Sequence, residues 1–271
     1  MKKFVLITYI FSFVLFSFAF AVEKYRDKQI SIEIVPATKA IEKGKENLFA
    51  VKVKLTKGWH IYWQNPGDAG EPTILEISTN IPNQQKIIPQ YPVPTYKNTS
   101  GIVTLEYRDV VYFPFYLWIP QDFDKKDLEI QLKAKWLVCK HICIPGKAII
   151  TKKFQISNGN LKFLQNNEIL NSLKFIPKDT ILGEIKLSSN SALLKFPLNF
   201  EDRLRKVFFY PITEGVFDLE LEPEFSTSGN ELSMRLPFVR YIWGDTSNIE
   251  GVVEFTFDNG KKKYFVTKFV K

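Results

Sequence analysis

The sequence has few of the residues from which most catalytic and metal sites are built. Its 271 residues include only two cysteines, two histidines and two methionines. Two histidines leave little room for the general base of a hydrolase. The chain also shows no hydrolase triad, phosphate-binding loop or nucleotide-binding motif. These shortages argue against the common hydrolase and nucleotide-dependent classes of enzyme.

Long apolar runs are missing beyond the first twenty residues. No later segment has the ~18 unbroken apolar residues of a membrane-spanning helix. At the start, two lysines precede an apolar run over residues 4–18, and an A-x-A cleavage signal ends at Ala21. This pattern predicts a secretory signal peptide over residues 1–21, cut after Ala21, with an uncleaved membrane anchor as the alternative. No cysteine follows the run, which argues against a lipoprotein anchor, so we expect a soluble periplasmic protein.

A basic stripe is missing too. Lys and Arg total 37 against 29 Asp and Glu, for a formal net charge of +8. The positive charges are scattered, apart from Lys261 to Lys263, which follow a turn signal. Proteins that bind nucleic acid concentrate basic residues on one face. We therefore expect no nucleic-acid partner and attribute the net charge to solubility.

The sequence does contain a dense series of strand patterns between residues 30 and 156. Apolar residues occupy every second position of residues 49–55 and again of residues 128–138. Pro114, inside the run VVYFPFYLWIP, suits an edge strand or a bulge. Clusters of Pro, Gly, Asn and Asp separate these runs at short intervals, which is typical of an all-β sandwich.

Residues 158–178 interrupt the strand patterns with a helical one. Asn160 can cap this helix, and Pro177 follows its end. Its apolar positions are Phe163, Leu164, Ile169, Leu170 and Leu173. Strand patterns then resume, and an Asp-Asn-Gly turn at residues 258–260 predicts a hairpin. We therefore predict a first β-sandwich over residues 22–157, a linking helix over 158–178 and a second, smaller β-sandwich over 179–271.

Both cysteines lie in the stretch KWLVCKHICIPGKA, residues 135–148. Cys139 ends an alternating strand, and another apolar run begins at Ala148. The simplest structure is a hairpin with Lys140-His141-Ile142 at its tip. Opposed residues of antiparallel strands lie ~4.5–5.5 Å apart at Cα, which is within reach of a disulfide. A helix is disfavoured, because Pro145 and the β-branched neighbours of the cysteines oppose it.

Three roles are open for this pair. A purely structural disulfide would add little stability, because one bridge across so small a loop hardly constrains the unfolded chain. A metal site would use Cys139, His141 and Cys143, which suit Cu(I) better than Zn(II) because no fourth ligand is evident. Exported thiols are usually oxidised, however, which disfavours coordination. A redox pair would be helped by Lys140 or His141, since a cation beside a sulfur lowers the pKa of the thiol.

A second motif, GWHIYWQNPGDAGEPT at residues 58–73, supplies further candidates. Its aromatic side chains either fill the core or shield a disulfide. Asp68 is a candidate proton acceptor for a thiol, although a turn-stabilising role is more common for such a residue. Tyr107 is expected near the same end of the domain, and Trp136 lies on the strand that leads into Cys139. We include Asp68, Tyr107 and Trp136 as supporting site residues.

Together these motifs resemble a known family. KGWHIYWQNPGDAGEPTILEI, YPVPTYKNTSGIVTLEYRDVVYFPFYL and WLVCKHICIPGKA are similar, in this order, to the N-terminal periplasmic region of DsbD/ScsB thiol:disulfide interchange proteins. The resemblance covers about residues 28–155 and implies an immunoglobulin-like sandwich without a cofactor. It implies that Cys139 and Cys143 shuttle between dithiol and disulfide, taking electrons from a membrane partner and passing them to periplasmic disulfide-containing proteins. It also associates the fold with cytochrome c biogenesis and copper tolerance.

The sequence departs from the family in one respect. Full-length members continue into a transmembrane electron carrier and a thioredoxin-like domain, and neither follows here. The resemblance therefore implies a membrane thiol-electron transporter that acts in trans. Cysteine spacing varies within the family, so roles within the pair do not transfer, but we expect Cys143 to be the more exposed, attacking sulfur. A non-catalytic binding or assembly protein with a structural disulfide, and a copper-handling protein, remain the alternatives.

Overall fold

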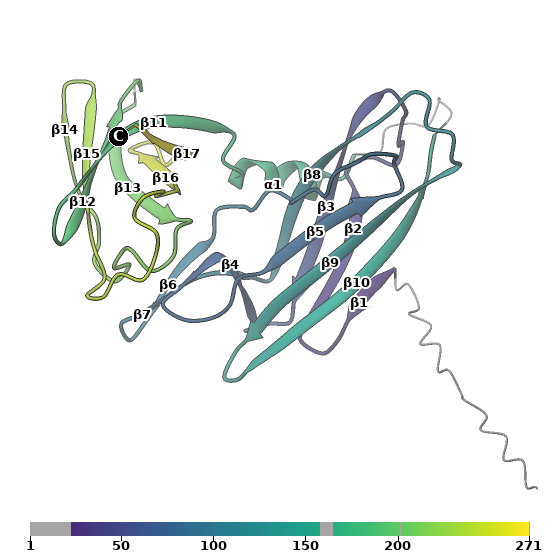
Figure 1. Ribbon diagram of the computed structural model, residues 1–271, viewed down its shortest axis with the longest axis horizontal. Coiled ribbons are helices and arrows are strands. Elements are labelled where there is room, and N and C mark those ends of the chain that lie inside the picture. Colours follow the sequence, from purple (N-terminus) through teal and green to yellow (C-terminus); the bar gives the residue numbers. More distant parts are fainter. Residues whose placement is uncertain (1–22, 158–164, 201, 271) are drawn as a thin grey trace, which may run out of the picture.

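The computed structural model describes residues 23–157, 165–200 and 202–270, and this part of the chain is almost entirely β-structure. Figure 1 shows two β regions that lie side by side and are joined by a short helix. The first region is built on two sheets and the second on one. This architecture confirms the predicted all-β fold class. Neither of the short helices in the described residues has the length and apolar character needed to cross a membrane.

The first sheet of the first region has the strand order β1-β2-β3-β8. Its inner face is apolar because every second residue of β3 from Phe49 to Leu55 is buried, as the alternation predicts. Pro114 lies on β8, which is an edge strand of this sheet, so its missing N–H breaks no central ladder. The strands are β1 (Lys24–Arg26), β2 (Ile30–Pro36), β3 (Lys45–Leu55) and β8 (Val110–Ile119).

The second sheet has the order β10-β9-β4-β7-β6, and β5 also pairs with β9. The alternation over residues 128–138 places one face of β9 in the core, where its apolar side chains are at most 3% exposed. The two inner faces share one apolar core, which confirms the predicted sandwich. The strands are β4 (His60–Gly67), β5 (Ile74–Thr79), β6 (Thr95–Thr99), β7 (Ile102–Arg108), β9 (Asp127–Cys139) and β10 (Cys143–Gln155).

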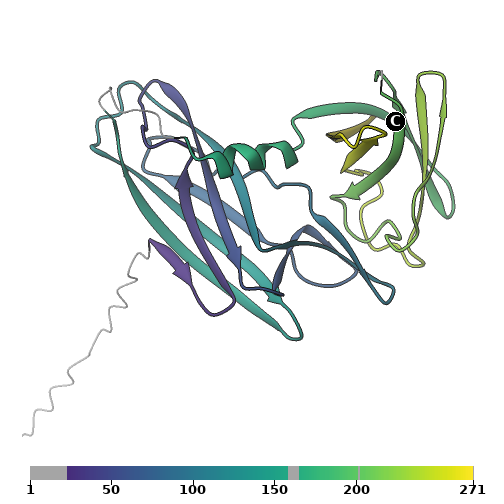
Figure 2. The same cartoon turned by 180° about the vertical axis from the view of Figure 1, so that it is seen from behind.

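The helix between the two β regions is short. Helix α1 (Asn167–Ser172) is followed by a single 3₁₀ turn, η1 (Leu173–Phe175). The Asn166 side chain caps α1 by accepting hydrogen bonds from the backbone N–H groups of the next turn. Ile169 is buried on the outer face of the first sheet, and Figure 2 shows α1 lying across that sheet before β11 begins. The predicted cap Asn160 and its neighbours Phe163 and Leu164 lie outside the described residues.

The second region is one seven-stranded sheet with the order β13-β16-β17-β11-β12-β15-β14. The first residues of β11 pair in parallel with β17, and its last residues pair antiparallel with β12. The sheet therefore folds over at β11 into two layers around a phenylalanine-rich core. The predicted hairpin is present as β16–β17. The strands are β11 (Asp179–Leu187), β12 (Ser191–Pro197), β13 (Leu204–Pro211), β14 (Glu224–Ser228), β15 (Glu231–Pro237), β16 (Gly251–Phe257) and β17 (Lys262–Val270).

Direct contacts join the two regions. The amide of the buried Asn65, near the end of β4, donates to the Pro211 carbonyl at 2.8 Å. The Tyr96 hydroxyl of β6 donates to the Leu219 carbonyl at 2.9 Å. The second region therefore docks against the β4 and β6 side of the sandwich.

Candidate functional site

The two cysteines form a disulfide across the turn of the β9–β10 hairpin. Figure 1 shows where this hairpin lies in the first region. Cys139 and Cys143 are opposed in the strand register, with their sulfurs 2.02 Å apart and their Cα atoms 4.1 Å apart. Lys140, His141 and Ile142 form the exposed tip, as the sequence predicts. The short Cα separation is that of a non-hydrogen-bonded pair, in which the backbone N–H groups point away from the neighbouring strand. Pro145, two residues further along β10, occupies the same kind of position. Its lack of an N–H therefore removes no hydrogen bond to β9. This explains how a proline fits beside the bridge.

The two ends of the disulfide differ in exposure. Cys139 is 2% exposed, whereas Cys143 lies on the solvent-facing outer strand and is exposed. A thiolate arriving from solvent therefore reaches Cys143 first. Which cysteine is attacked stays a prediction, but the predicted difference in exposure is present.

A row of directly opposed residues crosses the sheet at the disulfide. The row runs from Cys143 on β10 through Cys139 on β9 to His60 on β4 and Arg108 on β7. Opposed residues of neighbouring strands project from the same face of a sheet. His60 is therefore the neighbour of Cys139 on the side away from Cys143.

A charge network centred on the buried Glu106 holds His60 in place. Glu106, whose side chain is 1% exposed, lies 2.6 Å from Arg108 Nε and 3.4 Å from His60 Nε2. Arg108 Nη2 lies 3.4 Å from His60 Nδ1, and the Tyr62 hydroxyl lies 3.3 Å from Nε2. Burial lowers the pKa of His60 below 6.5; the Glu106 carboxylate opposes this shift and the Arg108 guanidinium supports it. A neutral ring satisfies the network, with Nδ1 accepting from Arg108 and Nε2–H donating to the Tyr62 hydroxyl.

The part of the chain that carries this site matches a known family. Residues 31–155 match the family described as "Thiol:disulfide interchange protein DsbD, N-terminal". This segment belongs to the DsbD N-terminal family. Its cysteines form the disulfide described above, so the domain holds a closed cysteine pair of the kind on which thiol:disulfide interchange depends.

The fold likeness extends beyond the DsbD N-terminal domain. The crystal structure of the N-terminal periplasmic domain of ScsB from Proteus mirabilis is similar to this chain, with a TM-score of 0.61 and 17% sequence identity. The match covers 90% of this chain and 95% of that chain. At this identity the likeness concerns the fold, and it includes the second β region. No curated protein matches the sequence.

In the DsbD N-terminal domain, the predicted supporting residues lie in three different surroundings. Lys140 and His141 are exposed at the hairpin tip beside the sulfurs, and the Lys140 side chain lies over Gly58. Trp136 projects into the core, on the opposite face of β9 from Cys139. It packs edge to face on Tyr25, with ring centroids 5.0 Å apart. Trp136 therefore supports the hairpin from beneath.

Asp68 and Tyr107 make contacts elsewhere in the domain. Asp68 Oδ2 accepts the backbone N–H of Val103 at 2.8 Å, which ties the loop after β4 to β7. Tyr107 is buried, and its hydroxyl donates to the Pro92 carbonyl at 2.6 Å. Both contacts stabilise the scaffold, and neither residue belongs to the row that contains the disulfide.

His60, Glu106 and Arg108 were not predicted as site residues. The sequence carries them in the patterns WHIYW and LEYRD, which mark two strands but not their neighbours. Only the register brings His60 opposite Cys139. A pattern of period two identifies a strand locally, whereas the pairing of distant strands is a property of the whole fold.

The alternative metal site does not exist in the disulfide form. The sulfurs of Cys139 and Cys143 are bonded to each other, so neither is a free thiolate for a metal, and His141 is exposed at the tip. Within the described residues, no three His, Cys, Asp or Glu side chains cluster as a metal site would require. Binding of Cu(I) at these three residues would first require reduction of the bridge.

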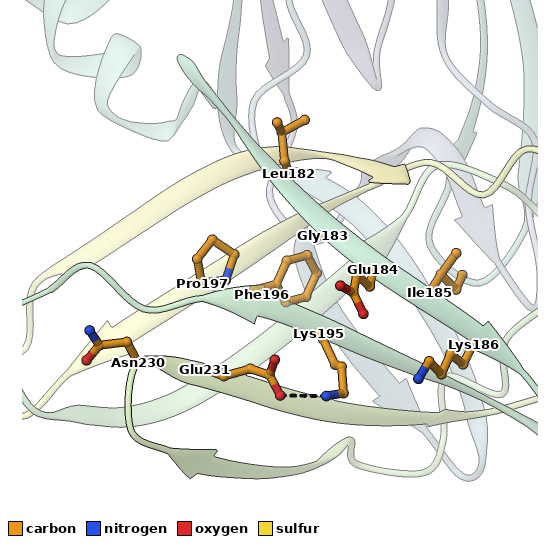
Figure 3. Close-up of a pocket in the computed structure, with 10 residues that line it drawn as sticks. All are labelled: Leu182, Gly183, Glu184, Ile185, Lys186, Lys195, Phe196, Pro197, Asn230 and Glu231. Carbon is orange, nitrogen blue, oxygen red and sulfur yellow. Dashed lines mark hydrogen bonds and ion pairs between the residues drawn. The ribbon is translucent and has the colours of Figure 1, made fainter. Parts of the chain in front are cut away.

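A large hollow lies in the second β region. It has a volume of about 740 Å³ and opens where β11 leaves β17 for β12. Figure 3 shows Phe196 and Pro197 in it, with Lys195 and Glu231 paired at its edge, 2.7 Å apart. It contains neither cysteine and no other nucleophilic thiol. The hollow therefore lies apart from the disulfide, which is in the first β region.

Proposed function

We propose that this protein is a periplasmic thiol:disulfide interchange module that passes electrons through Cys139 and Cys143. The observation that supports this best is a disulfide at the turn of the β9–β10 hairpin in a DsbD N-terminal domain. In this disulfide Cys143 is exposed and Cys139 is buried. A bridge in a shallow, open position is reachable by another protein, and disulfide exchange requires such access.

The reaction proceeds through a mixed disulfide. A thiolate of the reducing partner attacks Cys143 Sγ, the bridge breaks, and Cys139 leaves as a thiolate that takes up a proton. The second thiol of the partner then attacks the partner's sulfur in the mixed disulfide and releases Cys143. The partner is oxidised to a disulfide, and the domain gains two electrons and two protons. Transfer to a substrate disulfide repeats these steps in the opposite direction.

The partners follow from this chemistry. The reductant is a membrane thiol-electron transporter, and the acceptors are periplasmic proteins that contain disulfides. The DsbD N-terminal match and the periplasmic ScsB domain of the same fold support these assignments. No cofactor is needed, because the electrons move between sulfur atoms.

The reduction potential of the bridge tests the proposal. We expect a value above about −300 mV, measured by equilibration with a thiol buffer and counting of free thiols by mass spectrometry. A value below about −300 mV, which is typical of structural disulfides, would contradict the proposal and favour the alternative of a non-catalytic assembly protein.

Trapping variants test the direction of attack. Cys139→Ser leaves the exposed Cys143, which we expect to capture partners as lasting mixed disulfides in the periplasm. Cys143→Ser leaves only the buried Cys139 and serves as the matched control, expected to capture few. Equal capture by the two variants would show that Cys143 is not the attacked sulfur.

A further inference from the structure

The face of β9 and β10 beside the disulfide carries an unusual charge arrangement. Lys135 on β9 lies directly opposite Lys147 on β10. Like charges at directly opposed positions destabilise a sheet. Lys133 follows on the same face of β9, and Lys140 lies at the hairpin tip. All four lysines are exposed, and among the described residues none has an acidic group within 4 Å.

Two carboxylates on this face are already paired with other lysines. Glu76 lies opposite Lys133 but forms its ion pair with Lys86, at 3.1 Å. Glu129 lies near the start of β9, further from the disulfide, and pairs with Lys153 at 3.6 Å. The four lysines therefore leave an uncompensated positive charge beside the disulfide.

Exposed apolar side chains are interspersed with these lysines. Ile74 is 45% exposed, Ile149 is 56% exposed and Ile142 at the tip is 64% exposed. Ile74 lies opposite Lys135, and Ile149 lies opposite Lys133. An apolar centre with charged surroundings is the usual composition of a protein-binding surface. We call the seven residues of this surface the hairpin face: Ile74, Lys133, Lys135, Lys140, Ile142, Lys147 and Ile149.

The hairpin face lies within the footprint of any partner that reaches Cys143. Lys147 is four residues along β10, which is about 13 Å at the rise of a β-strand. A protein partner covers roughly 800 Å² on each side of a standard interface, a patch wider than that distance. A partner engaged at the disulfide therefore also covers Lys135 and Lys147.

We propose that the hairpin face is the docking surface for a redox partner whose own surface around its cysteine pair is acidic. This inference rests on the proposed function and names the chemistry of the partner. Carboxylates of such a partner would neutralise the opposed lysines, and its apolar residues would cover the isoleucines. A second copy of this chain does not fit, because it would bring the same lysines against each other.

Two synthetic dithiol peptides test this docking surface. Both contain Cys-Gly-Pro-Cys, one flanked by four glutamates and one by four lysines. The measurement is the rate at which each peptide reduces the bridge, by acid quench and thiol labelling, at low and at high salt. Flanking charges also change the reactivity of the peptide's own thiols, so each peptide is compared only between protein variants, with rates normalised to dithiothreitol.

We expect Lys135→Glu with Lys147→Glu to slow the acidic peptide by about tenfold at low salt and to speed the basic peptide. Both effects should shrink at high salt. The matched control, Lys186→Glu with Lys268→Glu, makes the same charge change on exposed positions of the second region and should change each rate less than twofold. Equal effects on both peptides, or an equal effect of the control, would overturn the docking surface alone. A bridge that dithiothreitol opens in no variant would overturn the proposed function, and the docking surface with it.

Discussion

His60 lies directly opposite Cys139 in the sheet, on the side of Cys139 that faces away from Cys143. The buried end of the disulfide therefore has a neutral, hydrogen-bonded imidazole as its neighbour, and the exposed end has solvent. Breaking the bridge at Cys143 releases Cys139 as a thiolate beside His60. The response of His60 to protonation thus bears on both the stability and the chemistry of the domain.

The first prediction concerns the pH dependence of stability. Burial lowers the pKa of His60 from 6.5 in the folded domain. As the pH falls through 6.5, the unfolded chain binds a proton that the folded domain does not, so stability is full above 6.5 and falls towards the folded pKa. Each unit of difference is worth about 1.4 kcal/mol. Urea unfolding at about pH 8 and about pH 5 should show a smaller loss for His60→Gln than for the natural sequence.

The control for this measurement is His141→Gln, which removes the exposed histidine at the hairpin tip. A smaller loss in His60→Gln but not in His141→Gln assigns the effect to the buried ring. An equal loss in the natural protein and in His60→Gln would contradict the assignment.

The second prediction concerns the charge network itself. Glu106→Gln removes the buried carboxylate that pairs with Arg108 and lies 3.4 Å from His60 Nε2. The new amide group would bring an N–H donor towards these two donors. We expect the free energy of unfolding to fall by about 1–3 kcal/mol. The pKa of His60 should also fall further, because the carboxylate that raises it is gone. Urea unfolding measures the first effect, and NMR titration of His60 measures the second.

Glu231→Gln is the matched control for that variant. It also removes a carboxylate from an ion pair, with Lys195, but the Glu231 side chain is 48% exposed. Exposed pairs contribute about 0–1 kcal/mol, so we expect a small change. A loss as large as that of Glu106→Gln would show that burial of the network does not matter.

The third prediction concerns the strand beneath the disulfide. Gly146 lies opposite Trp136, and a Cβ atom at Gly146 would be 2.3 Å from the indole ring. Gly146→Ala should therefore displace Trp136, lower stability by about 1–3 kcal/mol and change tryptophan fluorescence. Lys147→Ala, at the next and exposed position, should do neither. Unchanged fluorescence in Gly146→Ala would count against this contact.

The fourth prediction concerns the opposed lysines. Lys135→Glu alone places a carboxylate across from Lys147 and should raise stability by about 0.2–1 kcal/mol. Lys133→Glu provides the contrast, because it lies opposite Glu76 and should lower stability. Thermal unfolding at low salt measures both. No gain in Lys135→Glu would mean that Lys135 and Lys147 do not repel each other across the strands.

The sequence predicts those parts of the fold that depend on local patterns. The buried face of β9, the hairpin with Lys140 at its tip and the edge position of Pro114 all follow from alternation and from the missing N–H of proline. The same alternation puts Trp136 on the opposite face of β9 from Cys139. The two residues are close in the sequence, but their side chains do not lie on the same side of the sheet.

The network around His60 could not be predicted in this way. Its residues lie on β4 and β7, and their closeness to Cys139 depends on the order and register of strands that are distant in the sequence. The opposed pair of Lys135 and Lys147 depends on the register of one hairpin, which the disulfide fixes. Register within a hairpin is therefore predictable from the cysteines, whereas register across the sheet is not.

The position of Cys143 on an outer strand has a consequence for self-association. An unpaired strand edge can recruit the edge of another molecule and extend the sheet into an aggregate. Pro145 offers no N–H to a second chain, and Lys147 repels a copy of itself on the same edge. The strand can therefore leave its sulfur open to exchange partners while remaining a poor template for β-sheet growth between identical molecules.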